Sequence, residues 1–154
     1  MGNLAFFWCD HLESPGRAEP LFVECLDRAI RTLGPEHPQT LFFTSNFGAC
    51  LRELGRLAEA RATLEACVDA AGRVLGPEHR TTVLATDNLG LCLLRQGEAG
   101  EAARVLAGIE DAMARATGPQ SFHTERLRRR LAEARSAITN ASAGSAGSAA
   151  AGDA

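Results

Sequence analysis

The sequence predicts an all-α fold made of helical hairpins that stack side by side. Two observations lead to this prediction: a segment of the chain repeats every 42 residues, and apolar residues within each copy recur at the 3.6-residue spacing of an α-helix. Composition agrees, because the 154 residues include 28 Ala, the strongest helix former, and no Tyr. A hydrophobic fraction of 45% is enough for a packed core, which excludes a chain that is disordered throughout.

The repeat is marked most clearly by the motif Leu-Gly-Pro-Glu-His, which occurs at residues 33–37 and again at residues 75–79. Residues 33–70 match residues 75–112 at 17 of 38 positions, and a further Gly-Pro pair continues the same offset of 42. Agreement at this level over consecutive segments indicates copies of one structural unit rather than chance.

Each unit is predicted to be a pair of antiparallel helices. After the Gly-Pro loop, Thr40 is placed to cap a first helix over about residues 40–54, and Gly55 ends it. A second helix is expected over about residues 57–75, where small and apolar residues occupy one face and charged residues the other. One such hairpin cannot bury its apolar face alone, so neighbouring hairpins are expected to stack.

The chain resembles the tetratricopeptide repeat family, and the spacing of seven residues in one unit carries the resemblance: Asn46, Phe47, Gly48, Gly55, Glu59, Ala60 and Leu64. The 42-residue period and the Leu-Gly-Pro-Glu-His-Pro loop are similar to the long repeats of kinesin light chains and related proteins. The similarity extends from residue 3 to about residue 138, since Asn3-Leu4-Ala5 resembles the middle of a first helix. It implies a right-handed superhelical stack of antiparallel helix hairpins.

The resemblance also suggests how the chain is organised. A repeat domain over residues 1–138 is expected to comprise a clipped repeat at 1–33, full repeats at 34–75 and 76–117, and a terminal cap helix at 121–138. Gly100 and Gly108 weaken the second helix of the last full repeat. Residues 139–154 are mostly Ala, Gly and Ser with no large apolar side chain, so they are expected to be a disordered tail.

Charge and hydropathy exclude several classes of protein. The net charge of -3 and the pI near 5.8 leave no broad basic field for nucleic acid. No stretch approaches the ~20 apolar residues of a membrane span. The short apolar run at residues 4–8 has no basic residue before it and makes a poor signal peptide, so a cytoplasmic location is expected.

The residues that could carry chemistry are better explained as parts of the repeat. The five cysteines include no Cys-x-x-Cys pair, and four of them occupy equivalent positions where a small buried residue is expected. His37 and His79 lie in equivalent loops and are expected to fasten one hairpin to the next by hydrogen bonds. Because no nucleophile motif or phosphate-binding loop is present, the sequence predicts a non-catalytic protein without a cofactor or metal site.

The first helix of each repeat is expected to line a concave surface that binds a partner protein or peptide. The resemblance places partner contacts at its solvent-directed positions: Phe42, Ser45, Asn46, Ala49 and Arg52 in one repeat, and Leu84, Asp87, Asn88, Leu91 and Arg95 in the next. The cap helix adds Arg126, Arg129 and Arg130 toward the same end. The preferred peptide is therefore predicted to carry acidic residues there.

Two alternatives stay open from the sequence. The amides of Asn46 and Asn88 either pair with the backbone of an extended peptide or bond helices of the stack to one another. The function is accordingly an adaptor or scaffold that binds a peptide. Alternatively, the chain is a structural or regulatory segment that belongs to a larger assembly or self-associates through its incomplete N-terminal repeat, including Phe6, Phe7 and Trp8.

Overall fold

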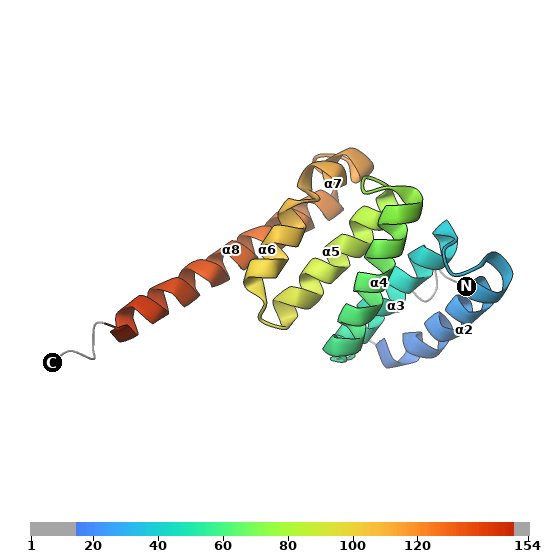
Figure 1. The fold of residues 1–154 in the computed structure, drawn as a ribbon, viewed down its shortest axis with the longest axis horizontal. Coiled ribbons are helices and arrows are strands. Elements are labelled where there is room, and N and C mark those ends of the chain that lie inside the picture. Colours follow the sequence, from blue (N-terminus) through green and yellow to red (C-terminus); the bar gives the residue numbers. More distant parts are fainter. Residues whose placement is uncertain (1–14, 150–154) are drawn as a thin grey trace.

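The computed structural model is all-α, as the helical periodicity predicts (Figure 1). It describes residues 15–149, and over that range it contains helices and no strand. The helices are α2 (Pro15–Leu33), α3 (Pro38–Glu53), α4 (Leu57–Leu75), α5 (Arg80–Arg95), α6 (Ala99–Ala107), α7 (Glu110–Thr117) and α8 (Phe122–Ala149).

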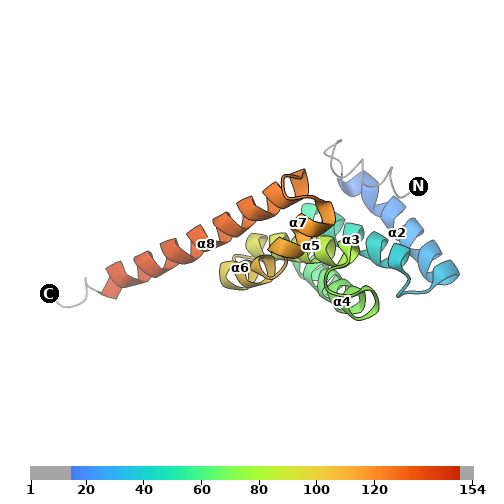
Figure 2. The same cartoon turned by 90° about the horizontal axis from the view of Figure 1, so that it is seen from above.

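The helices form a stack in which most pack on their neighbours in sequence. Helix α3 contacts α2, α4 and α5, while α5 contacts α4 and α6 as well. The helices α3 and α5 open the two repeats and pack directly against each other, and α8 packs on α6 and α7 with a smaller contact to α5. Seen from above, α4 and α6 lie on one side of the stack and α8 on the other (Figure 2).

The Gly-Pro loops are closed by the same hydrogen bonds in each copy. Gly34 has a φ of 92°, a conformation that glycine adopts without steric cost, and the hydroxyl of Thr40 donates to the Gly34 carbonyl at 2.8 Å. Thr82 makes the equivalent 2.8 Å bond one repeat later. Thr40 therefore closes the loop from within α3, and the prediction that it caps the helix is wrong.

The cap of α3 is His37, whose Nδ1 accepts a hydrogen bond from the backbone N–H of Gln39 at 3.2 Å. His79 caps α5 in the same way through the N–H of Thr81. Each histidine thus satisfies an N–H of its own helix, which otherwise lacks a partner in the first turn. The expected bond from one hairpin to the next is replaced by this local cap.

The two helices of each hairpin meet at a glycine. A Cβ atom added to Gly48 of α3 would lie 2.6 Å from Cγ of Leu64 on α4. In the next repeat, a Cβ on Gly90 of α5 would lie 2.3 Å from Cδ2 of Leu106 on α6. Both distances are far below van der Waals contact, so only glycine allows the leucine to reach this depth.

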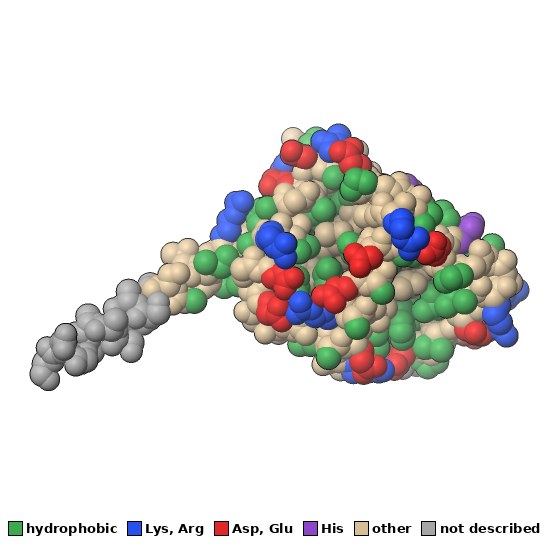
Figure 3. Space-filling view, in the orientation of Figure 1, with side chains coloured by type: hydrophobic (Ala, Val, Ile, Leu, Met, Phe, Trp, Pro, Cys, Tyr) green, Lys and Arg blue, Asp and Glu red, His purple; other side chains and the backbone are tan. Residues whose placement is uncertain are grey.

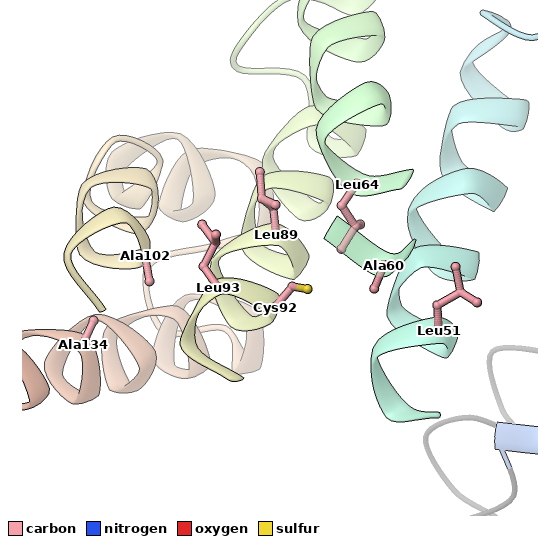
Figure 4. Packing of buried hydrophobic residues seen from close by; sticks show 8 residues of the cluster. All are labelled: Leu51, Ala60, Leu64, Leu89, Cys92, Leu93, Ala102 and Ala134. Atoms are coloured by element: carbon pink, nitrogen blue, oxygen red, sulfur yellow. The ribbon is translucent and has the colours of Figure 1, made fainter. Parts of the chain in front are cut away.

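The core runs through the whole stack. One buried cluster takes Leu51 from α3, Leu64 from α4, Leu93 from α5, Ala102 from α6 and Ala134 from α8 (Figure 4). Because these side chains come from successive hairpins, each hairpin buries the apolar face of the one before it.

Among residues 15–149 the cysteines form no disulfide bond with one another, and three of them are buried: Cys50, Cys67 and Cys92. Cys25 is half-buried. Burial raises the pKa of the Cys67 thiol to about 11, and its Sγ donates to the carbonyl of Leu41 at 3.3 Å. A buried, protonated thiol is a packing group rather than a nucleophile.

Ion pairs link residues that lie 37 positions apart on the outer surface. Glu36 in the first loop pairs with Arg73 near the end of α4, and Glu78 in the next loop pairs with Arg115 of α7. In the space-filling view, acidic and basic side chains lie next to one another on the face it shows (Figure 3). Such exposed pairs contribute about 0–1 kcal/mol each, so they add little to the stability of the stack.

The second helix of the last full repeat is interrupted. Helix α6 ends at Ala107 and α7 begins at Glu110, with Gly108 and Ile109 between them. The break falls at the glycine that the sequence identifies as a weak point.

The C-terminal helix is longer than predicted. Helix α8 continues to Ala149, so the expectation of a disordered tail is wrong for residues 139–149. Its first half is anchored by buried Leu127 and Leu131, and an alanine-rich segment extends an existing helix at little cost. The hydroxyl of Thr139 also donates to the backbone carbonyl four residues earlier. In Figure 1 this extension leaves the stack and projects away from it.

Several expectations concern residues outside the described part of the chain. These are the similarity of Asn3-Leu4-Ala5 to a first helix, the apolar run at residues 6–8, Cys9, and the end of the tail at residues 150–154.

The glycine contact predicts the effect of adding one methyl group. Gly90→Ala should lower the free energy of unfolding by about 1–3 kcal/mol, because Leu106 is displaced from the hairpin. Gly72→Ala in α4 is the matched control, since a Cβ there has no atom within 4 Å, and it should stabilise by about 0.5–1 kcal/mol. Urea denaturation followed by circular dichroism measures both, and equal stability of the two variants would contradict this account of the hairpin.

Candidate functional site

A pocket of about 470 Å³ opens between α3, α5 and α8, with one side chain contributed by α2. Its volume lies in the range typical of ligand sites. The walls combine apolar side chains with arginines, so the pocket suits a ligand that has both an apolar and a negatively charged part.

Most residues that the sequence assigns to a binding surface line this pocket: Phe42, Asn46, Ala49, Arg52, Leu84, Asn88, Leu91, Arg126 and Arg130. They come together because positions 42, 46 and 49 fall on one face of α3, and their equivalents fall on the same face of α5. Helix α8 closes the far end of the pocket with its two arginines.

Four predicted residues lie elsewhere. Ser45 and Asp87 are buried between helices, and their side-chain oxygens are engaged by α5 and α8 respectively. Arg95 pairs with Glu53 at 3.0 Å and does not line the pocket. Arg129 is exposed on α8, also away from the pocket lining.

The pocket also contains residues that the sequence analysis missed: Phe22, Glu53, Arg80 and His123. A helical spacing of four places Arg80 on the same face as Leu84, so extending the predicted face by one turn would have found it. Phe22 belongs to a second helix, and nothing in the single-repeat pattern indicates that it reaches the pocket.

The two asparagines differ although they are equivalent in the repeat. Nδ2 of Asn88 donates to Oγ of Ser45 at 3.2 Å, which ties α5 to α3. Nδ2 of Asn46 is buried and has no hydrogen-bond partner among the described residues. The structure thus assigns the helix-tying role to Asn88 and leaves the Asn46 amide with an unused donor.

Charged groups line the pocket, and their surroundings shift the pKa values of Glu53 and Arg130. Arg52, buried on α3, bonds to Glu53 at 2.9 Å. Burial raises the pKa of Glu53, but hydrogen bonds and charges from Arg52 and Arg95 outweigh this effect and hold the pKa below its ordinary value. Burial lowers the pKa of Arg130, and the charge of Asp87 offsets this only in part.

The described helices offer neither a metal centre nor a membrane span. Residues 15–149 contain no group of three or more His, Cys, Asp or Glu side chains placed to hold a metal ion. None of the helices in that range is long and apolar enough to cross a membrane.

Comparison with known proteins identifies the repeat. Two family models described as tetratricopeptide repeat match the chain, one over residues 1–39 and the other over residues 42–107. Curated protein sequences yield no match.

Solved structures with the same fold include the nearly identical TPR-like repeats assigned to a kinesin light chain of Podosopora anserina, with 21% identity and a TM-score of 0.79. A point variant of that protein gives the same 21% identity and a TM-score of 0.78. Each match covers 90% of this chain and 65% of the solved chain, so this chain spans about two thirds of the length of those structures. At this identity the likeness shows the fold alone.

The difference between the asparagines predicts different effects on stability. Asn88→Ala should lower the free energy of unfolding by about 1 kcal/mol, because it removes the bond that ties α5 to α3. Asn46→Ala is the matched variant and should cost less, since its amide donor has no bond to lose. Urea denaturation of both variants tests this, and a loss at Asn46 equal to that at Asn88 would show the contrast to be wrong.

Proposed function

Because the chain belongs to the tetratricopeptide repeat family, whose repeats generally mediate contacts between proteins, we propose that it is a non-catalytic module that binds an extended peptide. The binding surface in this proposal is the pocket formed by α3, α5 and α8. By holding a peptide of one protein there, the chain acts as an adaptor or scaffold.

One observation carries the proposal: the buried amide of Asn46 in the wall of the pocket. The residue is only 8% exposed, yet its Nδ2 has no partner among the described residues. A buried donor without an acceptor costs about 1–3 kcal/mol. The nitrogen is buried in the free protein, so the amide would turn toward the pocket, where a peptide carbonyl would supply the missing acceptor whatever the side chain of the peptide.

Apolar side chains of the pocket would contact the side chains of a bound peptide, in addition to the hydrogen bond made to its backbone. Phe42 is 37% exposed in the free protein, and Leu84 and Leu91 line the adjacent wall on α5. Burying such surface against a ligand contributes about 25 cal/mol per Å². The arginines at the α8 end favour a peptide with acidic residues at that end.

A peptide screen tests the proposal. Random peptides displayed on phage are selected on the full chain, and the affinity of a selected peptide is measured by fluorescence polarisation. Asn46→Ala and Leu91→Ser should each weaken binding by about 1–2 kcal/mol, or roughly 5- to 30-fold, because each removes one pocket contact.

The matched control is Val74→Ser, which removes an exposed apolar side chain from α4 outside the pocket. It should leave the affinity unchanged. Peptides whose binding responds to Val74→Ser, and to neither pocket variant, would contradict the proposed surface.

A second candidate function is self-association, and an observation on α2 favours it. Val23, Ile30 and Leu33 are exposed by 48%, 43% and 43%, and their spacing of seven and three residues places them along one side of the helix. A second copy of the chain would bury such a stripe. A dimer in light scattering that dissociates on Ile30→Glu would favour this function over peptide binding.

A further inference from the structure

A polar contact joins α5 to α3 and recurs between α8 and α5, and in both cases the two residues lie 43 positions apart in the sequence. Asn88 on α5 reaches back to Ser45 on α3. One repeat later, Arg130 on α8 reaches back to Asp87 on α5, with Nη1 at 2.5 Å from Oδ2. The two contacts occupy the same place in the stack, but the first is a neutral hydrogen bond and the second is a buried ion pair.

The ionic contact includes a second arginine. Nη2 of Arg126 lies 3.2 Å from the same Oδ2 of Asp87. Asp87 is fully buried, and the side chains of Arg126 and Arg130 are 18% and 9% exposed. Two guanidinium groups therefore share one carboxylate, which leaves one positive charge in excess inside the wall of the pocket.

The excess charge is available at Arg126. Its side chain is the more exposed of the two arginines, at 18% against 9% for Arg130, and its guanidinium lies over the ring of Phe122 at 5.3 Å. Arg130 is held closest to Asp87, and Arg52 is bonded to Glu53 and to the Asn88 carbonyl. A half-buried cation that shares its carboxylate with a second cation favours an additional anionic acceptor.

We propose that Asp87 is a positioning residue that holds Arg126 at the α8 end of the pocket, where Arg126 binds a carboxylate of the ligand. The proposal rests on the proposed function, because it concerns the same pocket. It assigns the anion specificity to Arg126 rather than to Arg95 or Arg129, neither of which lines the pocket. Asp87 acts through the arginines and contacts no ligand itself.

The direct test uses glutarate, a small dicarboxylate, as the probe. NMR signals of the arginine Nε–Hε groups are followed while glutarate is added to the full chain, with glutaramide as the neutral control. The Arg126 signal should shift and saturate with glutarate and stay in place with glutaramide. The exposed Arg129 is the internal control and should respond only as it does to an equal ionic strength of chloride. An Arg126 signal that does not move, or that moves only as Arg129 does, would overturn the proposal.

The repeat itself supplies the variant that separates positioning from stability. Asp87→Ser combined with Arg130→Asn reproduces the neutral pair of the preceding repeat. Hydrogen exchange should show α8 still protected, because the helix is still tied to α5. The glutarate affinity at Arg126 should fall about tenfold relative to Arg130→Asn alone, because the carboxylate that orients the Arg126 guanidinium is gone. An unchanged affinity would show that Asp87 is structural only.

The wild-type titration tests carboxylate binding by Arg126 without any variant, and the double variant tests the role of Asp87. The titration also uses no peptide, so a failed peptide screen leaves a positive glutarate result in place. Conversely, an Arg126 signal that does not shift would contradict this inference but not the proposal that the rest of the pocket binds a peptide.

Discussion

The close approach of Gly48 to Leu64, repeated by Gly90 and Leu106, sets the geometry on which the rest of the structure depends. Each glycine admits a leucine to a depth that a Cβ atom would block, because that atom would lie 2.6 Å or less from the leucine side chain. Both hairpins therefore close at the same depth. Because successive units have the same shape, residues 43 positions apart meet again on neighbouring first helices.

This regular stacking explains how polar residues are accommodated in the interior of the stack. Ser45, Asn88, Asp87 and Arg130 all lie between helices, and each contacts another across the stack. Burying such groups without partners would be costly, since an unpaired polar group loses its bonds to water. The donors left without a partner among the described residues include Asn46 Nδ2 and Arg126 Nε, and both residues line the pocket. These unsatisfied groups are the basis for proposing that a ligand binds at this surface.

Much of this fold follows from local sequence signals, and the differences have identifiable causes. Helix α4 spans the residues that the apolar spacing indicates, because its stripe and its flanking glycines are local features. The sequence favours Thr40 as the cap although His37 provides it, since the sequence alone does not show which side chain faces the first turn. It also predicts an end of α8 that is too early, because composition alone does not reveal that a docked helix extends through alanine-rich sequence.

The candidate site is predictable only in part, for a related reason. A helical face can be inferred from one repeat, and Phe42, Leu84 and Leu91, which the sequence places on such faces, line the pocket. Whether a polar side chain faces the pocket or a neighbouring helix depends on the offset between repeats. Asn46 and Asn88 have the same place in the sequence pattern. Even so, the Asn88 amide bonds to Ser45 on the preceding helix, whereas Nδ2 of Asn46 has no partner among the described residues.

The most direct test of the central claim is to map a selected peptide onto the chain by NMR. Backbone amide signals are assigned and followed as the peptide is added to the full protein. If the pocket binds the peptide, the largest changes fall on α3, α5 and the first half of α8. Changes confined to α4 and α6, the helices on the other side of the stack, would contradict this account.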